Sequence, residues 1–199
     1  LEGKIPLLIR AARKSQMEAA LRFVDEELKG EKVRVVFLGG DDAPEMARML
    51  AARQIPVIVD GTLRLPLRTD EAYDAPYTVP ARLAKAGVLV ALTDGAESAA
   101  RVRDLPNHAA MAMAFGLEPL EALRSVTLNP ARIYGVADRI GSIAPGKDAS
   151  FAVWTGDPLE ITSNLVALYQ KGVSLELSDR QKRLWEKYRN RPKTDLTKP

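Results

Sequence analysis

Short apolar runs alternate with amphipathic segments through the first half of the chain. The runs occupy residues 5–9, 33–38, 55–59 and 88–92. A run this short and this apolar is typical of a strand buried on both faces, as in a parallel sheet covered by helices. Between the first two runs, Met17, Leu21 and Val24 recur at helical spacing and predict the buried face of a helix. The alternation predicts four βα units with parallel strands and right-handed crossovers.

Capping residues and helix breakers mark where the predicted helices and loops begin and end. Residues 15–18, Ser-Gln-Met-Glu, have the spacing of a capping box, and Gly30 ends the helix that follows. Asp41 or Asp42 is the expected cap of the next helix. The segment 60–77 is a long loop, and loops of this length are usually functional or disordered. Its charges fit either a polar substrate or partner, or plain solvation: Arg64, Arg68, Asp70 and Glu71.

The second half of the chain first becomes helical and then returns to strands. The expected helices span residues 108–115, 119–126 and 178–191, with a short helical turn from Asn129. The expected strands span residues 139–143, 149–154 and 165–170. A turn over residues 144–148, Ala-Pro-Gly-Lys-Asp, joins the first two of these strands. This order predicts that strands of a second type follow the βα units.

Four βα units can form an open doubly wound sheet or half of an eight-stranded barrel, and the pattern alone does not choose between them. The glycines at 39 and 40 lack the spacing of a dinucleotide-binding turn, and the sequence has no Gly-Lys-Ser/Thr motif for phosphate. In both architectures, functional groups follow the carboxyl ends of the strands. Those positions hold Arg10, Asp41, Asp42, Asp60 and Asp94. An aspartate such as Asp94 can also simply cap a turn there.

Composition narrows the functional classes without choosing among them. The chain has 199 residues, a net charge of +3 and no cysteine, which excludes disulfides, thiolate metal sites and a cysteine nucleophile. Its basic residues are spread out, so we expect no nucleic-acid partner. No apolar run has the length of a membrane span, so we expect a soluble protein with no membrane partner. The chain begins at Leu1 rather than methionine, so we expect the natural N-terminus to be missing, and the compartment stays open.

Three stretches of the second half form an ordered series that resembles a known family. They are residues 116–132 (GLEPLEALRSVTLNPAR), 138–149 (DRIGSIAPGKDA) and 154–159 (WTGDPL). Together they resemble the C-terminal half of the amidohydrolase superfamily, in its imidazolonepropionase-like branch. The resemblance implies an α/β fold: the C-terminal half of a (β/α)8 TIM-type barrel with strands of a small flanking β-domain and a C-terminal helix. The implied boundaries are 1–135 for the half-barrel, 136–177 for the β-domain part and 178–199 for the helix and tail.

The resemblance also implies a chemistry and a site. Members hydrolyse C–N bonds in amides, cyclic amides or peptides, with one or two divalent, zinc-like metal ions at the mouth of the barrel. Asp94 matches the family's aspartate after the last strand, which binds metal or takes a proton from the attacking water. Arg10 stands where a histidine ligand is expected, and residues 39–40 offer no histidine either. We expect Arg10 and Asp60 to contact substrate, and Arg10 to pair with Asp94 at the former metal position. His108, the only histidine, is interpreted as a surface or helix-capping residue.

Half a barrel has open strand edges, so the resemblance predicts a companion. The companion is an N-terminal half-barrel in a separate chain, a fragment or a second copy, and we expect an oligomer. Two functions stay open: a C–N hydrolase whose missing half supplies the metal ligands, and a non-catalytic half-barrel or pseudoenzyme subunit that stabilises a partner chain. An open-sheet binding domain is the third alternative. The chain alone predicts no complete metal site.

Overall fold

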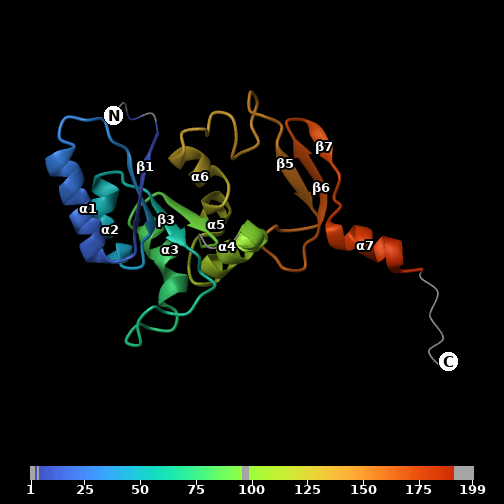
Figure 1. Ribbon diagram of the computed structural model, residues 1–199, viewed down its shortest axis with the longest axis horizontal. Helices are drawn as coiled ribbons and strands as arrows, with labels where there is room; N and C mark the ends of the chain where they lie inside the picture. Colours follow the sequence, from blue (N-terminus) through green and yellow to red (C-terminus); the bar gives the residue numbers. More distant parts are fainter. Residues whose placement is uncertain (1–2, 4, 96–98, 191–199) are drawn as a thin grey trace, which may run out of the picture.

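A four-stranded parallel sheet organises the first half of the protein (Figure 1). The computed structural model describes residues 3, 5–95 and 99–190. The strands stand side by side in sequence order: β1 (Leu7–Ala11), β2 (Val35–Gly39), β3 (Val57–Asp60) and β4 (Val90–Thr93). All three pairings are parallel, so the four carboxyl ends lie at one edge of the sheet. This order is the arc of a barrel wall, because each strand adds next to the one before it.

Helices cover one face of the sheet and connect its strands. The connecting and covering helices are α1 (Lys14–Glu27), the 3₁₀ helix η1 (Ala43–Met46), α2 (Ala47–Ala52), α3 (Ala75–Lys85), η2 (Ala99–Asp104), α4 (Leu105–Ala114) and α5 (Pro119–Ser125). The helix α6 (Leu128–Ile133) follows α5 and lies on the other face. Alternate strand residues such as Phe37 and Val57 meet Met17, Leu50 and Leu83 of the helices in one fully buried core. Burying each such side chain contributes about 1.5–3 kcal/mol, which holds the helices on this face.

The opposite face of the sheet is covered at its amino end by α6. Val36, Ile58 and Ala91, which alternate with the helix-facing residues, pack against Ile133. Arg34, just before β2, donates to the Ile133 carbonyl at 2.8 Å, and the Asn129 amide donates to the Val90 carbonyl at 2.8 Å. α6 therefore closes the amino end of the inner face, opposite the carboxyl ends of the strands.

A small antiparallel sheet and a terminal helix follow, on the side away from α1 in Figure 1. Its strands are β5 (Phe151–Trp154), β6 (Leu165–Gln170) and β7 (Val173–Leu175), and the helix is α7 (Arg180–Tyr188). Lys171 and Gly172 both have positive φ and form the two-residue turn between β6 and β7. The Phe151 and Tyr169 rings stack with centroids 4.8 Å apart, which joins β5 to β6.

The structure confirms the four predicted βα units and corrects several element boundaries. Residues 139–143, predicted as a strand, form turns, because Gly141 adopts a φ of 90° and the Asp148 N–H closes back on the Arg139 carbonyl at 2.8 Å. α1 begins at Lys14, before the predicted cap, and the Gln16 side chain accepts from the Arg13 N–H instead. In the parts of the chain that the structure describes, no helix is long and apolar enough to cross a membrane.

Candidate functional site

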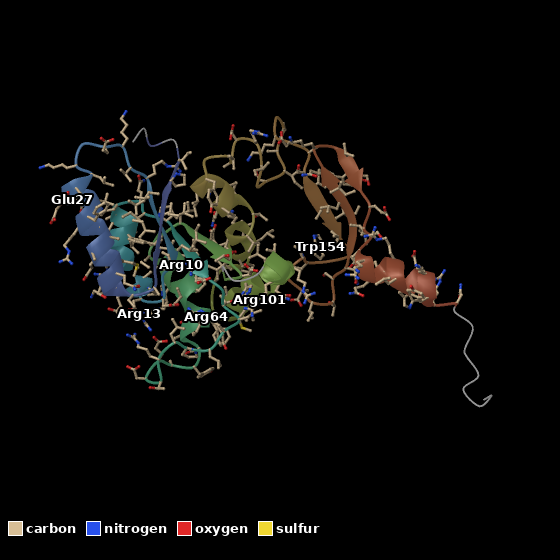
Figure 2. The ribbon with its side chains drawn as sticks, viewed as in Figure 1. Arg10, Arg13, Glu27, Arg64, Arg101 and Trp154 are labelled. Atoms are coloured by element: carbon tan, nitrogen blue, oxygen red, sulfur yellow. The ribbon has the colours of Figure 1, made fainter. Side chains whose placement is uncertain are left out.

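A cavity of about 410 Å³ lies at the carboxyl ends of the strands. We call it the strand-end cavity. Its lining includes the three predicted site residues and several others: Arg10, Asp60, Gly61, Leu63, Arg64, Asp94, Gly95, Arg101, Asp104 and His108. Figure 2 shows Arg10, Arg64 and Arg101 near one another beside the parallel sheet. The fold thus brings Arg10, Asp60 and Asp94, from three different strand ends, to one space.

Arg10 forms its ion pair with Asp60, and the predicted pairing with Asp94 is wrong. The Arg10 Nη1 atom lies 3.0 Å from the Asp60 Oδ2 atom. The sheet register explains the choice. Arg10 is level with Leu38 and Ile58, and Asp60 follows Ile58 by two residues, so both side chains of the pair point to the inner face. β4, which precedes Asp94, lies one strand farther away, so Asp60 meets the guanidinium first.

Two carboxylate oxygens in the strand-end cavity have no hydrogen-bond partner among the described residues. They are Asp60 Oδ1 and Asp94 Oδ2, and both atoms are shielded from solvent. Among the described residues, the other oxygen of Asp94 has only a marginal contact, from the Thr93 hydroxyl at 3.5 Å. A buried carboxylate oxygen without a donor is costly, so both atoms are suited to accept a proton or an N–H or O–H group from a bound molecule.

His108 is buried and lines this cavity, so its interpretation as a surface or helix-capping residue is wrong. Only 6% of its surface is exposed. Its Nδ1 atom accepts the backbone N–H of Thr62 at 2.9 Å and of Leu63 at 3.2 Å. The Thr62 hydroxyl in turn donates to the His108 carbonyl at 2.9 Å. Burial lowers the pKa of His108, and this outweighs the opposite effect of Asp94, so the ring is held neutral.

The loop after β3 is fastened to the sheet by ion pairs within the chain. We call this set the loop ion network: Arg13, Asp41, Asp42, Arg64, Arg68 and Glu71. Glu71 lies 3.1 Å from Arg13 and 2.9 Å from Arg68, and Arg64 pairs with Asp41. Arg64 also donates to the carbonyls of Asp60 and Gly61, both at 3.1 Å.

Most of the loop charges have partners within the chain, an arrangement that neither interpretation of these charges, substrate binding or plain solvation, predicted. Arg64, Arg68 and Glu71 hold the loop, whereas Asp70 has a side chain that is 83% exposed. Asp41 and Asp42, expected as helix caps, pair with arginines of the network, and neither caps η1 with its side chain.

The described residues of this chain do not form a metal site by themselves. Among the described residues, no group of three or more histidine, aspartate and glutamate side chains is placed to hold one. The guanidinium of Arg10 already neutralises Asp60, and the Nδ1 atom of His108 is occupied by backbone N–H groups. Among the described residues, Asp94 and Asp60 each keep a shielded oxygen without a donor, but Asp60 is already paired with Arg10, and two carboxylates do not complete a zinc-like site.

Similar proteins point to one family. A sequence profile described as the amidohydrolase family matches residues 14–175. An imidazolonepropionase of Shewanella frigidimarina is 41% identical over 61 residues, which are 31% of this chain and 14% of that protein. An imidazolonepropionase of Erwinia tasmaniensis is 50% identical over 52 residues, which are 26% of this chain and 12% of that protein.

A solved structure extends the likeness to the fold. An amidohydrolase from Thermotoga maritima superposes with a TM-score of 0.78 and 34% sequence identity, over 87% of this chain and 44% of that one. The chain thus spans less than half the length of the relatives it matches, and its four parallel strands correspond to part of a TIM-type barrel. The profile match covers most of the chain, so the chain belongs to the amidohydrolase family.

Proposed function

We propose that this chain is the C-terminal half of a hydrolase of C–N bonds in amides, cyclic amides or peptides. A separate N-terminal half, with the first four βα units, completes the barrel. Membership of the amidohydrolase family supports the reaction class, and the match to 44% of a related chain supports the missing half. The observation that carries the proposal is Asp94, whose Oδ2 atom is buried at the strand-end cavity with no donor among the described residues.

In this proposal Asp94 takes a proton from the attacking water. A carboxylate with a shielded, unpartnered oxygen is a good acceptor, because proton transfer replaces the missing hydrogen bond. Arg10 donates N–H groups to the substrate's carbonyl oxygen, where negative charge develops. Asp60, held by Arg10, accepts an N–H of the substrate through its Oδ1 atom. Arg10 and Asp60 thus orient the C–N bond beside Asp94.

A divalent, zinc-like metal ion is the usual cofactor of the family, where it polarises the carbonyl and activates water. The described residues of this chain do not form its site, so any such ion needs ligands beyond them, which in this proposal come from the N-terminal half.

The test is Asp94→Asn in the complete protein, that is, this chain together with its N-terminal half. Hydrolysis of a panel of N-acyl amino acids, hydantoins and dipeptides should fall by about 100-fold or more, as expected for loss of a general base. Asp70→Asn is the matched control, because its side chain is 83% exposed. If the Asp94→Asn variant hydrolysed the panel as fast as the natural protein, the proposal would be wrong.

The Arg10–Asp60 ion pair also favours a second function, a non-catalytic half-barrel that stabilises a partner chain. In that case the permanently charged guanidinium of Arg10 fills the space between the strand ends, and the role of Asp60 is to pair with it and stabilise the fold. The complex would then raise the partner's unfolding temperature but hydrolyse none of the panel. Intact-mass analysis of the purified complex shows whether a second polypeptide accompanies this chain. A stable monomer that consists of this chain alone would contradict both functions.

A further inference from the structure

His108 joins two elements that both border the strand-end cavity. It stands in the first turn of α4, and the backbone groups it binds belong to Thr62 and Leu63, directly after β3. The Thr62 hydroxyl returns a bond to the His108 carbonyl, and Thr62 is fully buried. Among the described residues, the N–H groups of Thr62 and Leu63 have no other acceptor, so removal of the His108 side chain would leave both unpaired, which is costly.

The same region sets the position of the two site carboxylates. The Gly61 N–H donates to the Thr93 carbonyl at 2.9 Å, which ties the end of β3 to the end of β4. A Cβ atom on Gly61 would lie 3.3 Å from the His108 ring and 3.6 Å from the Asp94 carbonyl carbon. Asp60 directly precedes this junction, so any shift of residues 61–63 moves its carboxylate relative to Arg10 and Asp94.

We propose that His108 is a positioning residue: its Nδ1 atom holds residues 62 and 63 against α4 and thereby fixes Asp60 beside Asp94. Because Nδ1 accepts two N–H groups, it carries no proton, and the neutral ring keeps its proton on Nε2. Nδ1 cannot take up a proton without losing both bonds. His108 is therefore no general base through Nδ1, and that role stays with Asp94. This inference rests on the proposed function in one respect, which is the catalytic use of the Asp60 and Asp94 carboxylates.

The geometry allows a test by two substitutions of similar size. The amide group of Asn lies close to where Nδ1 of histidine lies, whereas the amide of Gln lies near Nε2. His108→Asn should therefore keep an acceptor for Thr62 and Leu63, and His108→Gln should lose it. Asn107→Gln, at the exposed neighbour in the same helix, is the matched control.

Hydrogen exchange of the Thr62 and Leu63 amides in the complete protein is the first measurement. We expect exchange to be about tenfold faster or more in His108→Gln, and to return to within about threefold of the natural rate in His108→Asn. The ¹³C resonance of the Asp60 carboxyl should move in the Gln variant and stay in the Asn variant. Equal effects of the two variants would overturn the positioning role.

The tautomer is the second measurement and needs no variant. His108 is the only histidine of this chain, so its ¹⁵N resonances are assigned without ambiguity when this chain alone carries the ¹⁵N label. We expect Nδ1 in the range of an unprotonated ring nitrogen and Nε2 in the range of a protonated one. A proton on Nδ1 would overturn the inference even if both variants failed to fold. Neither measurement uses turnover, so the inference and the proposed hydrolysis can fail independently.

Discussion

Arg10 and Asp60 pair over 3.0 Å although β2 separates their strands. The pair spans β2 at the point where that strand ends at Gly39 and Gly40 follows, so no side chain of these two residues stands between the charges. The guanidinium thus occupies the place where the sequence resemblance expects a histidine ligand. This relationship leads to the first prediction.

Replacing Arg10 by histidine should create metal affinity. The change removes a fixed cation, frees Asp60 and adds an imidazole ligand close to the Asp60 and Asp94 carboxylates. After incubation with Zn²⁺ and dialysis, we expect less than about 0.1 equivalent of zinc in the natural protein and severalfold more in Arg10→His. Mass-spectrometric metal analysis measures both. Arg10→Lys serves as control because it keeps the cation. One full equivalent in the natural protein would show that the N-terminal half builds a site despite Arg10.

Stability should depend on pH through His108. Burial lowers the pKa of this histidine in the folded protein, although the carboxylates of Asp94, Asp104 and Asp60 act to raise it. An unfolded histidine titrates near 6.5. The unfolded chain then binds more protons, so the stability is present above about pH 6.5 and is lost as the pH falls.

Urea unfolding at pH 7.5 and at pH 5.5 measures this dependence. The decrease in the free energy of unfolding from pH 7.5 to pH 5.5 should be smaller in His108→Asn, because asparagine has no ring to protonate. A loss of the same size in both proteins would assign the dependence to the carboxylates instead.

The loop ion network should loosen when Glu71 loses its charge. Burial alone would raise the pKa of Glu71, but hydrogen bonds from Arg13 and from the backbone of Leu67 and Arg68 outweigh it and lower the pKa. In Glu71→Gln we expect proteolytic cleavage within residues 61–74 to be about tenfold faster, because the loop opens more often. In the natural protein, cleavage should also become faster as the pH falls, because the charged form of the Glu71 carboxylate is the one that holds the loop. Asp70→Asn should leave the rate unchanged.

Gly40→Ala should destabilise the sheet by about 2–4 kcal/mol, because it adds a steric clash to backbone strain. Gly40 has a φ of 73°, and a Cβ atom there would lie 2.7 Å from the Val57 side chain. Gly146 has a φ of 86° and nothing within 4 Å, so Gly146→Ala should cost only about 1 kcal/mol. Chemical unfolding of both variants isolates the contact from the strain. Equal losses of stability in the two variants would mean that the Val57 side chain moves aside at no energetic cost.

The βα units were predictable because strands buried on both faces leave continuous apolar runs, as at residues 88–92. The site was predictable only in part. Asp94, Asp60 and Arg10 could be placed at strand ends, but the partner of Arg10 depends on the register between β1 and β3, which no local pattern reveals.

His108 was missed for a similar reason. Its burial comes from Thr62, which lies 46 residues earlier in the chain, and a histidine in the first turn of a helix looks like a surface residue until that contact is known. The signal that existed was Gly61-Thr62 directly after the Asp60 strand end, a small-residue turn that lets the backbone approach another element closely. Residues 139–143 do not form the predicted strand. The Lys147 ammonium folds back and donates to the Ser142 hydroxyl at 2.7 Å, which stabilises a turn instead.

The packing of Ile133 against Val36, Ile58 and Ala91 sets how this half could be combined with others. In the proposed complete barrel, α6 of this chain would close the amino end of the inner face, whichever first half supplies the remaining strands. A first half grafted from a relative would need matching edges at β1 and β4 but no plug of its own. Such chimeras would keep one sealed end and one open end, so their substrates would enter and leave beside Asp94.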